Sequence, residues 1–432
     1  MANTYVSDPE QIVNDDHITK FVNTLNKPWF SRAWIVQEAA LSPNPAVLLG
    51  SELFDLRMLC HLLLVVSSLE ANTSTHQSVR SSRVLRARGA HTLRHIQTCR
   101  LQLQDKTPVQ HGLSFLDILR RLAFAVDASD ARDQVYAFLA LQDPRHIQIK
   151  PDYSLDTIDA YAVVSASLAK STCSLSILGL TRWGPSPFPS WAVDWRLNKS
   201  TQGRPFDRDG REYFDACRGY PYRAVHEFKV GSNYLTVRGR LVARVTVVSQ
   251  VAHHAKLLPQ AWNIEEVTKS LILGSRFDKI PLQDHSQSDL PKRVLTVLMA
   301  LDTKAFASDR ERDECLDTML RVYENYERIV KNDVALADLS HLRVVAKNLA
   351  RRVGISGNKR VFWSEDGLIG LGPQPIKRKD FVWILHGSKV PVILRKCNRD
   401  SYIVVGQCYY EKWMYGDLVD WKEDKGDVVN LV

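Results

Sequence analysis

A short segment rich in proline and tryptophan divides the sequence into two parts of different character. It covers residues 182–196, with a glycine and three prolines around Phe188 and tryptophans at positions 183, 191 and 195. Prolines favour turns and large indole rings favour burial, so the segment predicts an ordered junction and not a flexible linker. We assign the tryptophans to packing, with a ligand groove lined by them as the alternative. A chain of 432 residues can hold two or three domain-sized units, and we place a domain boundary near this junction.

The part before the junction combines helical and strand-like patterns, which predicts an α/β unit. Several segments repeat apolar residues every three or four positions, whereas residues 46–49 form a short apolar run before Gly50. Ser129 and Asp130 precede one helical segment as candidate N-caps, and Asp133 lies in its first turn, where it complements the helix dipole. The predicted helices cover residues 16–26, a segment from Pro28, 53–69, 114–125, 131–141 and 157–170, and the predicted strands cover 46–49 and 147–149.

The part after the junction predicts an α+β region. Gly367, Gly370 and Gly372 are assigned to turns, because no helix follows them that could present N–H groups to a phosphate. The predicted strands cover residues 234–237, 241–251, 360–363, 381–385, 390–394 and 402–406, with a charged helical stretch from 260 to 352. We therefore divide the chain into a first unit (1–175), a tryptophan-rich junction with strands (176–259), a helical insertion (260–355) and a small β-rich module (356–432).

Composition excludes several classes of protein. The 57 basic and 48 acidic residues give a net charge of +9 that is spread along the chain, unlike the dense basic stripe of a nucleic-acid reader. The seven cysteines include no C-x-x-C pair, so neither a disulfide framework nor a zinc knuckle is predicted. The N-terminus lacks the pattern of a signal peptide, and no apolar run is long enough to span a bilayer. We expect a cytoplasmic protein with no membrane contact.

The segment from Pro28 predicts a buried helix that carries one carboxylate. Trp34 and Glu38 fall on one stripe of this helix, together with Phe30 and Leu41. Apolar residues at positions 35, 36, 39 and 40 cover its other sides, so we expect Glu38 to lie in an apolar setting that raises its pKa. Two interpretations stay open. In the structural one, Glu38 accepts backbone hydrogen bonds or pairs with an arginine such as Arg32 or Arg132; in the other, it acts in catalysis.

Three motifs, in order along the chain, resemble the fungal heterokaryon-incompatibility (HET) domain. They are Pro28-Trp29-Phe30-Ser31-Arg32-Ala33-Trp34-Ile35-Val36-Gln37-Glu38, the run from Asp130 to Leu141, and Pro151-Asp152-Tyr153-Ser154. Downstream, Pro189-Ser190-Trp191 and Asp194-Trp195 resemble the element that follows this domain in the family. Family members begin their HET domain upstream of the first motif, with a strand that this sequence lacks. We therefore expect the C-terminal part of a HET domain, truncated at its N-terminal end.

The resemblance implies a fold, a chemistry and a set of site residues. HET domains are similar to TIR domains, so it implies an incomplete TIR-like or flavodoxin-like α/β unit. The spacing of Trp34 and Glu38 matches the Trp-x-x-x-Glu helix of TIR domains that cleave NAD, which makes Glu38 the implied catalytic residue and NAD the implied substrate. The implied supporting residues are Trp29, Arg32, Trp34 and Gln37. The further family residues are Asp130, Arg132, Asp133, Tyr136, Asp152 and Tyr153.

Two other groups of side chains have alternative interpretations. His91 and His95 lie one helical turn apart, but an H-E-x-x-H glutamate and a third ligand are missing, so we predict a solvated helix face and no metal site. The arginines between positions 80 and 100 could form a basic ridge, but no aromatic residues alternate with them for base stacking. We therefore do not predict nucleic-acid binding. These arginines are Arg80, Arg83, Arg86, Arg88, Arg94 and Arg100.

Two functional hypotheses follow from the resemblance. In the first, the chain is an incompatibility-type protein of fungal self/non-self recognition and programmed cell death that contacts a non-self or signalling partner, or a second copy of itself, and breaks down NAD. In the second, it is a non-catalytic binding or regulatory module, or a decayed remnant. Ligands of flavodoxin-like sheets bind beside the loops that follow the first strands, so we expect the truncated chain to lack an intact NAD pocket. Release of nicotinamide from NAD separates the two hypotheses.

Overall fold

The computed structural model describes two compact units. Its described residues are 15–73, 83–104, 114–142, 149–196 except 183 and 185, 214–248, 359–421 and 425–432, with single positions at 297, 310, 314 and 317. The first unit consists of residues 1–160 and 195–199, and the second of residues 161–194 and 200–432. Each unit is described by itself. None of the described helices has the length and apolar character to cross a bilayer.

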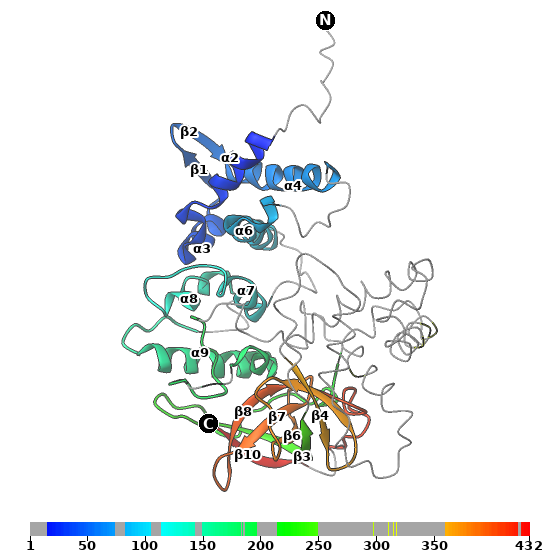
Figure 1. Cartoon of the computed structure of the whole chain (residues 1–432). Coiled ribbons are helices and arrows are strands. Elements are labelled where there is room, and N and C mark those ends of the chain that lie inside the picture. Colours follow the sequence, from blue (N-terminus) through cyan, green and yellow to red (C-terminus); the bar gives the residue numbers. More distant parts are fainter. Residues whose placement is uncertain are drawn as a thin grey trace, which may run out of the picture. The chain divides into compact units, whose positions relative to one another are not determined.

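The first unit is mainly helical (Figure 1). Its only strands among the described residues are β1 and β2, which pair as an antiparallel hairpin. The parallel sheet of a TIR-like or flavodoxin-like unit is not among the described residues here, so that assignment stays a prediction. The elements are α2 (Asp15–Leu25), η1 (Pro28–Ser31), α3 (Ala33–Leu41), β1 (Ala46–Leu49), β2 (Glu52–Asp55), α4 (Leu56–Thr73), α5 (Arg83–Arg86), α6 (Arg88–Gln104), α7 (Phe115–Leu122), α8 (Asp133–Tyr136) and η3 (Leu139–Leu141). Helix α9 (Thr157–Thr172) begins in this unit.

Several predicted elements are confirmed and others need correction. The strand at 46–49 and the helices from Pro28 and near 114–125 are present, and Ser114 caps α7 with a capping box. Leu53 was expected in a helix but lies in strand β2. The predicted helix over 131–141 consists of two short pieces, α8 and η3. Of the predicted strand at 147–149, Ile147 and Gln148 lie outside the described residues, and Ile149 is not in a strand.

A close crossing between α6 and η1 organises the core of the first unit. A Cβ atom at Gly89 would lie 2.3 Å from the backbone oxygen of Leu25 and 2.7 Å from the Cβ of Phe30, so only glycine allows this approach. Phe30 of η1, Val36 of α3 and Leu93 of α6 are all buried. The amphipathic pattern of these helices thus becomes a shared apolar core.

Arg100 is buried within this core, which corrects its assignment to an exposed basic ridge. Its exposed fraction is 3%, and its guanidinium donates hydrogen bonds to backbone oxygens in the last turn of α3 and just after it. The acceptors are the carbonyl oxygens of Ala39, Ala40, Ser42 and Pro43. The last carbonyl groups of a helix have no partners within the helix, so this arginine serves as the C-terminal cap of α3.

We predict that Arg100→Ala lowers the free energy of unfolding by about 3 kcal/mol, because it leaves several buried carbonyl groups without a donor. Urea denaturation followed by far-ultraviolet circular dichroism measures the change. Arg94 is exposed on the same helix, so Arg94→Ala is the matched control and should change the stability by less than about 0.5 kcal/mol. Equal stability of the two variants would contradict the capping role.

The second unit contains a mixed sheet of eight described strands. The junction segment, the rest of α9 and the short helix η4 (Ser176–Leu180) precede it. The strands are β3 (Leu235–Val248), β4 (Lys359–Ser364), β5 (Ile369–Pro373), β6 (Phe381–Leu385), β7 (Val392–Lys396), β8 (Ser401–Gln407), β9 (Tyr409–Tyr410) and β10 (Asp427–Leu431). The two runs predicted at 234–237 and 241–251 are one long strand, β3. Nearly all of the predicted helical insertion at 260–355 lies outside the described residues.

Five of the described strands close into a ring (Figure 1). The order β3–β6–β7–β8–β10 returns to β3, because β10 pairs in parallel with β8 and antiparallel with β3. Strand β3 pairs with β10 along Leu235–Gly239, with β6 along Gly239–Arg244 and with β4 along Val245–Val248. Irregularities after Leu241 and after Val245 interrupt the register, and such bulges bend a strand. The result is a small closed barrel, from which β4, β5 and β9 continue.

Two of the predicted turn glycines lie in a strand. Gly370 and Gly372 belong to β5 and face Phe362 of β4; a Cβ at position 370 would lie 2.2 Å from its ring. Only Gly367 is in a turn, with a φ of 75°. The Phe362 ring stacks on Tyr410 with a centroid distance of 5.8 Å, so the glycines make room for an aromatic pair in the core.

The junction tryptophans pack as predicted. Trp191 and Trp195 are fully buried, and the Trp191 indole N–H donates to the backbone oxygen of Asn233 at 3.1 Å. Trp183 lies outside the described residues. Within the second unit, the Ser190 hydroxyl accepts from the backbone N–H of Val404 at 2.8 Å and donates to the backbone oxygen of Val432. The Pro-Ser-Trp element therefore anchors the end of the chain to the barrel.

Candidate functional site

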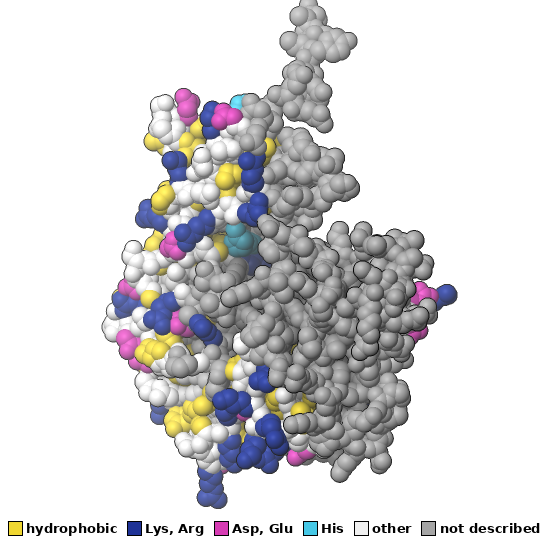
Figure 2. Space-filling model, in the orientation of Figure 1, with side chains coloured by type: hydrophobic (Ala, Val, Ile, Leu, Met, Phe, Trp, Pro, Cys, Tyr) yellow, Lys and Arg dark blue, Asp and Glu magenta, His cyan; other side chains and the backbone are white. Residues whose placement is uncertain are grey.

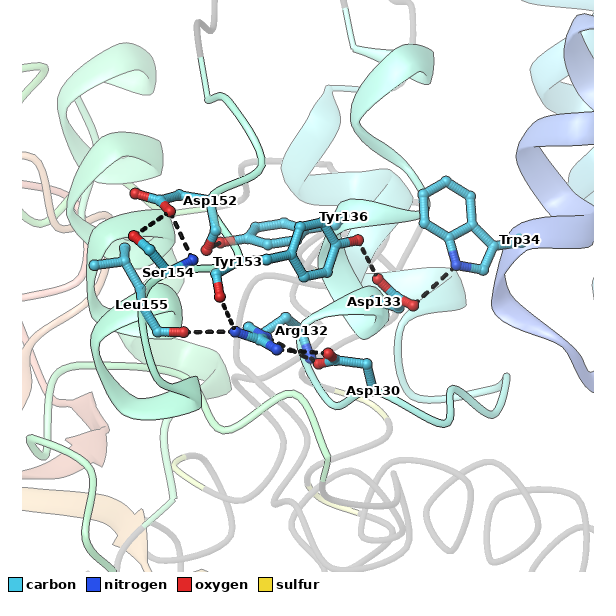
Figure 3. A network of polar contacts seen from close by, with 9 residues as sticks. All are labelled: Trp34, Asp130, Arg132, Asp133, Tyr136, Asp152, Tyr153, Ser154 and Leu155. Carbon is cyan, nitrogen blue, oxygen red and sulfur yellow. Dashed lines mark hydrogen bonds and ion pairs between the residues drawn. The ribbon is translucent and has the colours of Figure 1, made fainter.

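The three family motifs of the first unit meet at one carboxylate, that of Asp133 (Figure 3). The indole N–H of Trp34, on α3, donates to Asp133 Oδ2 at 3.0 Å. The phenol of Tyr153, in the third motif, donates to Asp133 Oδ1 at 2.6 Å. Each motif supplies one member, and a carboxylate that accepts two such bonds holds both aromatic side chains in place.

Arg132 joins the second motif to the third. Its guanidinium binds Asp130 through two parallel bonds, with Nε to Oδ1 at 3.0 Å and Nη2 to Oδ2 at 2.7 Å. Its Nη1 donates to the backbone oxygens of Tyr153 and Leu155 at 2.8 and 2.7 Å. The Arg132 side chain holds the pKa of Asp130 below its usual range, and Asp130 raises the pKa of Arg132. Both groups are therefore charged at neutral pH.

The third motif forms a turn that is closed by its own side chains. Asp152 Oδ1 accepts from the backbone N–H and the hydroxyl of Ser154 at 2.9 and 2.6 Å, and these bonds lower the pKa of Asp152. The Tyr136 phenol donates to the backbone oxygen of Asp152 at 3.2 Å, and its ring meets that of Tyr153 edge to face. Desolvation and the bond to Asp133 raise the pKa of Tyr153 to about 12. Tyr153 is thus a neutral donor near physiological pH.

These contacts correct the prediction that Asp130 is a helix N-cap, whereas Asp133 lies in the first turn of α8 as predicted. The N-cap of α8 is Arg132, and it makes no side-chain capping bond. Asp130 pairs with Arg132, and Asp133 binds Trp34 and Tyr153. The Asp133 carboxylate therefore connects motifs that are distant in sequence, whereas Asp130 orients Arg132 within its own motif.

The other residues of the first motif have structural contacts or exposed side chains. The Gln37 side-chain oxygen accepts from the backbone N–H of Ala140 at 3.2 Å, which connects α3 to η3. The Trp29 ring packs edge to face on Phe30 with a centroid distance of 4.8 Å. The Arg32 side chain is exposed, and the backbone on either side of it pairs with Asp127.

Glu38 is exposed, so the prediction that it lies in an apolar setting is wrong. No hydrogen bond or ion pair connects its carboxylate to a residue that the structure describes, and the proposed partner Arg132 is bound to Asp130. The exposure of the predicted stripe of side chains increases along the chain. Phe30 is buried, Trp34 is half-buried and Leu41 is 46% exposed. Helix α3 buries the side formed by positions 33, 35, 36, 39 and 40 instead. The apolar environment expected around the Glu38 carboxylate is therefore not what the structure shows.

The two histidines of α6 contact each other and are half-buried, which corrects the prediction of a solvated face. Their Nε2 atoms lie 3.2 Å apart, and their ring centroids 4.3 Å. Among the described residues, no group of three or more histidine, cysteine, aspartate or glutamate side chains is arranged to hold a metal ion.

Two comparisons with known proteins point to the same family. The family model of the Het-6 beta-barrel domain matches residues 292–429, a range that includes β4 to β9 of the barrel. The sequence is 20% identical to heterokaryon incompatibility protein 6, OR allele, of Neurospora crassa, across 95% of this chain and 67% of that protein. No solved structure matches. Together with the motif network of the first unit, these similarities support a protein of the fungal heterokaryon-incompatibility (HET) type, in which residues 292–429 resemble the Het-6 beta-barrel domain.

Proposed function

We propose that this protein acts in fungal self/non-self recognition and cell-death signalling through protein contacts, and not through chemistry at Glu38. The observation that supports this proposal is the set of hydrogen bonds and ion pairs made by the charged motif residues. Asp133, Arg132 and Asp130 are all engaged by other groups of the chain, whereas Glu38 is exposed and separate from them. A network in which charges and donors are satisfied by each other stabilises a surface. Its pKa shifts lead away from neutral pH, lower for Asp130 and higher for Tyr153, which does not favour acid–base catalysis.

The network supports a surface that helix α3 presents. Trp34 connects α3 to Asp133, and Gln37 connects it to Ala140, so α3 is held at two positions. Glu38 and Leu41, on the exposed side of the same helix, are available to a partner. An exposed acidic residue beside an exposed apolar one suits the rim of a protein interface. The partner in this proposal is a non-self or signalling protein, or a second copy of the chain, in the cytoplasm.

NAD cleavage by a TIR-like site is the alternative, and it rests on the Trp34–Glu38 spacing. We predict that the purified full-length protein releases no nicotinamide from NAD above the buffer rate, and that Glu38→Gln does not change this result. Chromatographic detection of nicotinamide is the measurement. Release by the wild type that Glu38→Gln abolishes would establish the enzyme and overturn the proposal.

The signalling proposal is tested in a filamentous fungus that expresses the chain from an inducible promoter. Induction should arrest growth, and Glu38→Gln should arrest it equally. Glu38→Arg with Leu41→Arg should relieve the arrest, because these changes disturb the exposed side of α3 without entering the core. A fluorescent tag reports the cytoplasmic location and the amount of each variant. Arrest that is insensitive to the double variant, or no arrest at equal expression, would contradict the proposal.

A further inference from the structure

We propose that a pocket in the second unit binds a small organic molecule that carries a diphosphate group. The pocket has a volume of about 490 Å³, within the range of small-molecule sites. It lies between residues 246–248 of β3, Arg360 of β4 and the loop residues 376–378. It is independent of the motif network of the first unit and of the proposed signalling function.

The charge of the pocket wall points to an anion. Arg360, Lys377 and Arg378 line it, and none of the lining residues that the structure describes is a carboxylate. The nearby Asp380 is buried and paired with Arg395. Figure 2 shows lysine and arginine side chains gathered over the described barrel region. One phosphate carries a charge of roughly −1.5 to −2, so three cations match a diphosphate better than a single phosphate.

Arg360 lies where β4 and the loop 376–378 meet in the pocket wall. Its Nη1 donates to the backbone oxygen of Ile376 at 3.3 Å, which directs the guanidinium of β4 to the loop that carries Lys377 and Arg378. Partial burial lowers the pKa of Arg360, because water solvates its charge incompletely. A bound anion restores the lost stabilisation. Arginine is also suited to bind phosphate oxygens in pairs.

The loop is held before any ligand binds. Asp380 Oδ2 accepts from the Lys377 backbone N–H at 2.7 Å, and the backbones of Lys379 and Asp380 each bond to Val245 at 2.8 Å. The side chain of Arg395 holds Asp380 from the other side through two bonds of 2.7 Å. A preorganised cationic loop costs less to order on binding, which raises affinity.

The remaining wall is suited to the organic part of the ligand. Val247, Val248 and Ile376 provide an apolar surface, and the Thr246 hydroxyl is already bound to the backbone oxygen of Trp363 at 3.1 Å. The described part of the wall has no aromatic residue, so it offers none of the stacking surfaces of single-stranded nucleic-acid sites. A pocket with cations at one wall and aliphatic groups at another favours a small organic diphosphate.

Isothermal titration calorimetry of the full-length protein tests the inference, with ADP as the organic diphosphate and sodium pyrophosphate as the anion alone. Both should bind, ADP more tightly, and both affinities should fall as salt is added. Arg360→Gln and the double variant Lys377→Gln/Arg378→Gln should each weaken ADP binding by about tenfold or more, as expected for the loss of a charge-assisted contact. Lys377 and Arg378 are exposed, so the double variant keeps the test valid if Arg360→Gln fails to fold.

The matched control is Lys396→Gln, an exposed cation of β7 outside the pocket lining. It should leave ADP binding unchanged, and circular dichroism confirms that every variant is folded. Absence of saturable binding by both probes, or an equal loss in Lys396→Gln, overturns the proposal. A parallel flotation assay uses phosphatidylcholine vesicles with phosphatidylinositol 4,5-bisphosphate. Vesicle binding that ADP does not displace would assign the pocket to a lipid headgroup and overturn the free small molecule.

Discussion

Replacing Asp380 by alanine is expected to lower the free energy of unfolding by about 3–5 kcal/mol, the range found when one partner of a buried ion pair is removed. Asp380 is 2% exposed and binds Arg395 through two bonds of 2.7 Å. The variant leaves the guanidinium of Arg395 poorly solvated and the Lys377 backbone N–H without its acceptor. Urea denaturation of the protein, followed by tryptophan fluorescence, measures the loss in the free energy of unfolding.

The control for this prediction is an exposed carboxylate of the same barrel. Asp400 lies in the turn between β7 and β8 and is exposed, so Asp400→Ala should change the stability by less than about 0.5 kcal/mol. Since Asp380 also holds the loop of the cationic pocket, Asp380→Ala should weaken ADP binding at temperatures where the protein is still folded. An Asp380→Ala protein with wild-type stability would mean that the buried pair contributes nothing to the barrel.

Asp133→Ala is expected to lower the free energy of unfolding by about 3 kcal/mol, because two charge-assisted hydrogen bonds disappear together. The variant leaves the indole N–H of Trp34 and the phenol of Tyr153 without their acceptor. The far-ultraviolet circular dichroism signal in a urea titration reports the change, since the first unit is mainly helical. In the fungal assay this variant should lose growth arrest, because α3 is no longer held.

A double-mutant cycle separates the network from general loss of packing. Tyr153→Phe removes one hydrogen bond and keeps the ring, so it should cost about 1 kcal/mol by itself. In the Asp133→Ala background, the same change should cost almost nothing. Additive effects of the two substitutions would show that Tyr153 and Asp133 do not depend on each other.

Local patterns in the sequence were sufficient for part of this architecture. The strand at 381–385 has the predicted boundaries, and the indoles of Trp191 and Trp195 are buried as expected. In both cases the determinant is local: a run of apolar β-formers between turns, or an aromatic side chain beside prolines. The resemblance to HET proteins was also found from residues alone, and the comparisons support a HET-type protein.

The site could not be predicted in the same way, because its determinants are distant in sequence. Helical periodicity places Trp34 and Glu38 on one stripe of α3 but does not say which side of the helix is buried. In the structure the buried side is the one formed by positions 33, 35, 36, 39 and 40. Asp133 resembles a dipole partner at a helix start until its bond to Trp34, 99 residues away, is known. Gly370 resembles a turn residue until the Phe362 ring is seen against it.

Closure of the barrel has a consequence for how the protein reaches its native state. Thr236 on β3 and Asn430 on β10 share a hydrogen bond across 194 positions of sequence, so the ring closes only when very distant segments meet. Contacts of such long range slow folding, because closing the large loop costs conformational entropy before the strand pairing contributes any favourable free energy. Until β10 docks, the edges of β3 and β8 offer unpaired backbone groups that a neighbouring molecule's β10 can occupy. Folding at high concentration should therefore yield strand-exchanged dimers.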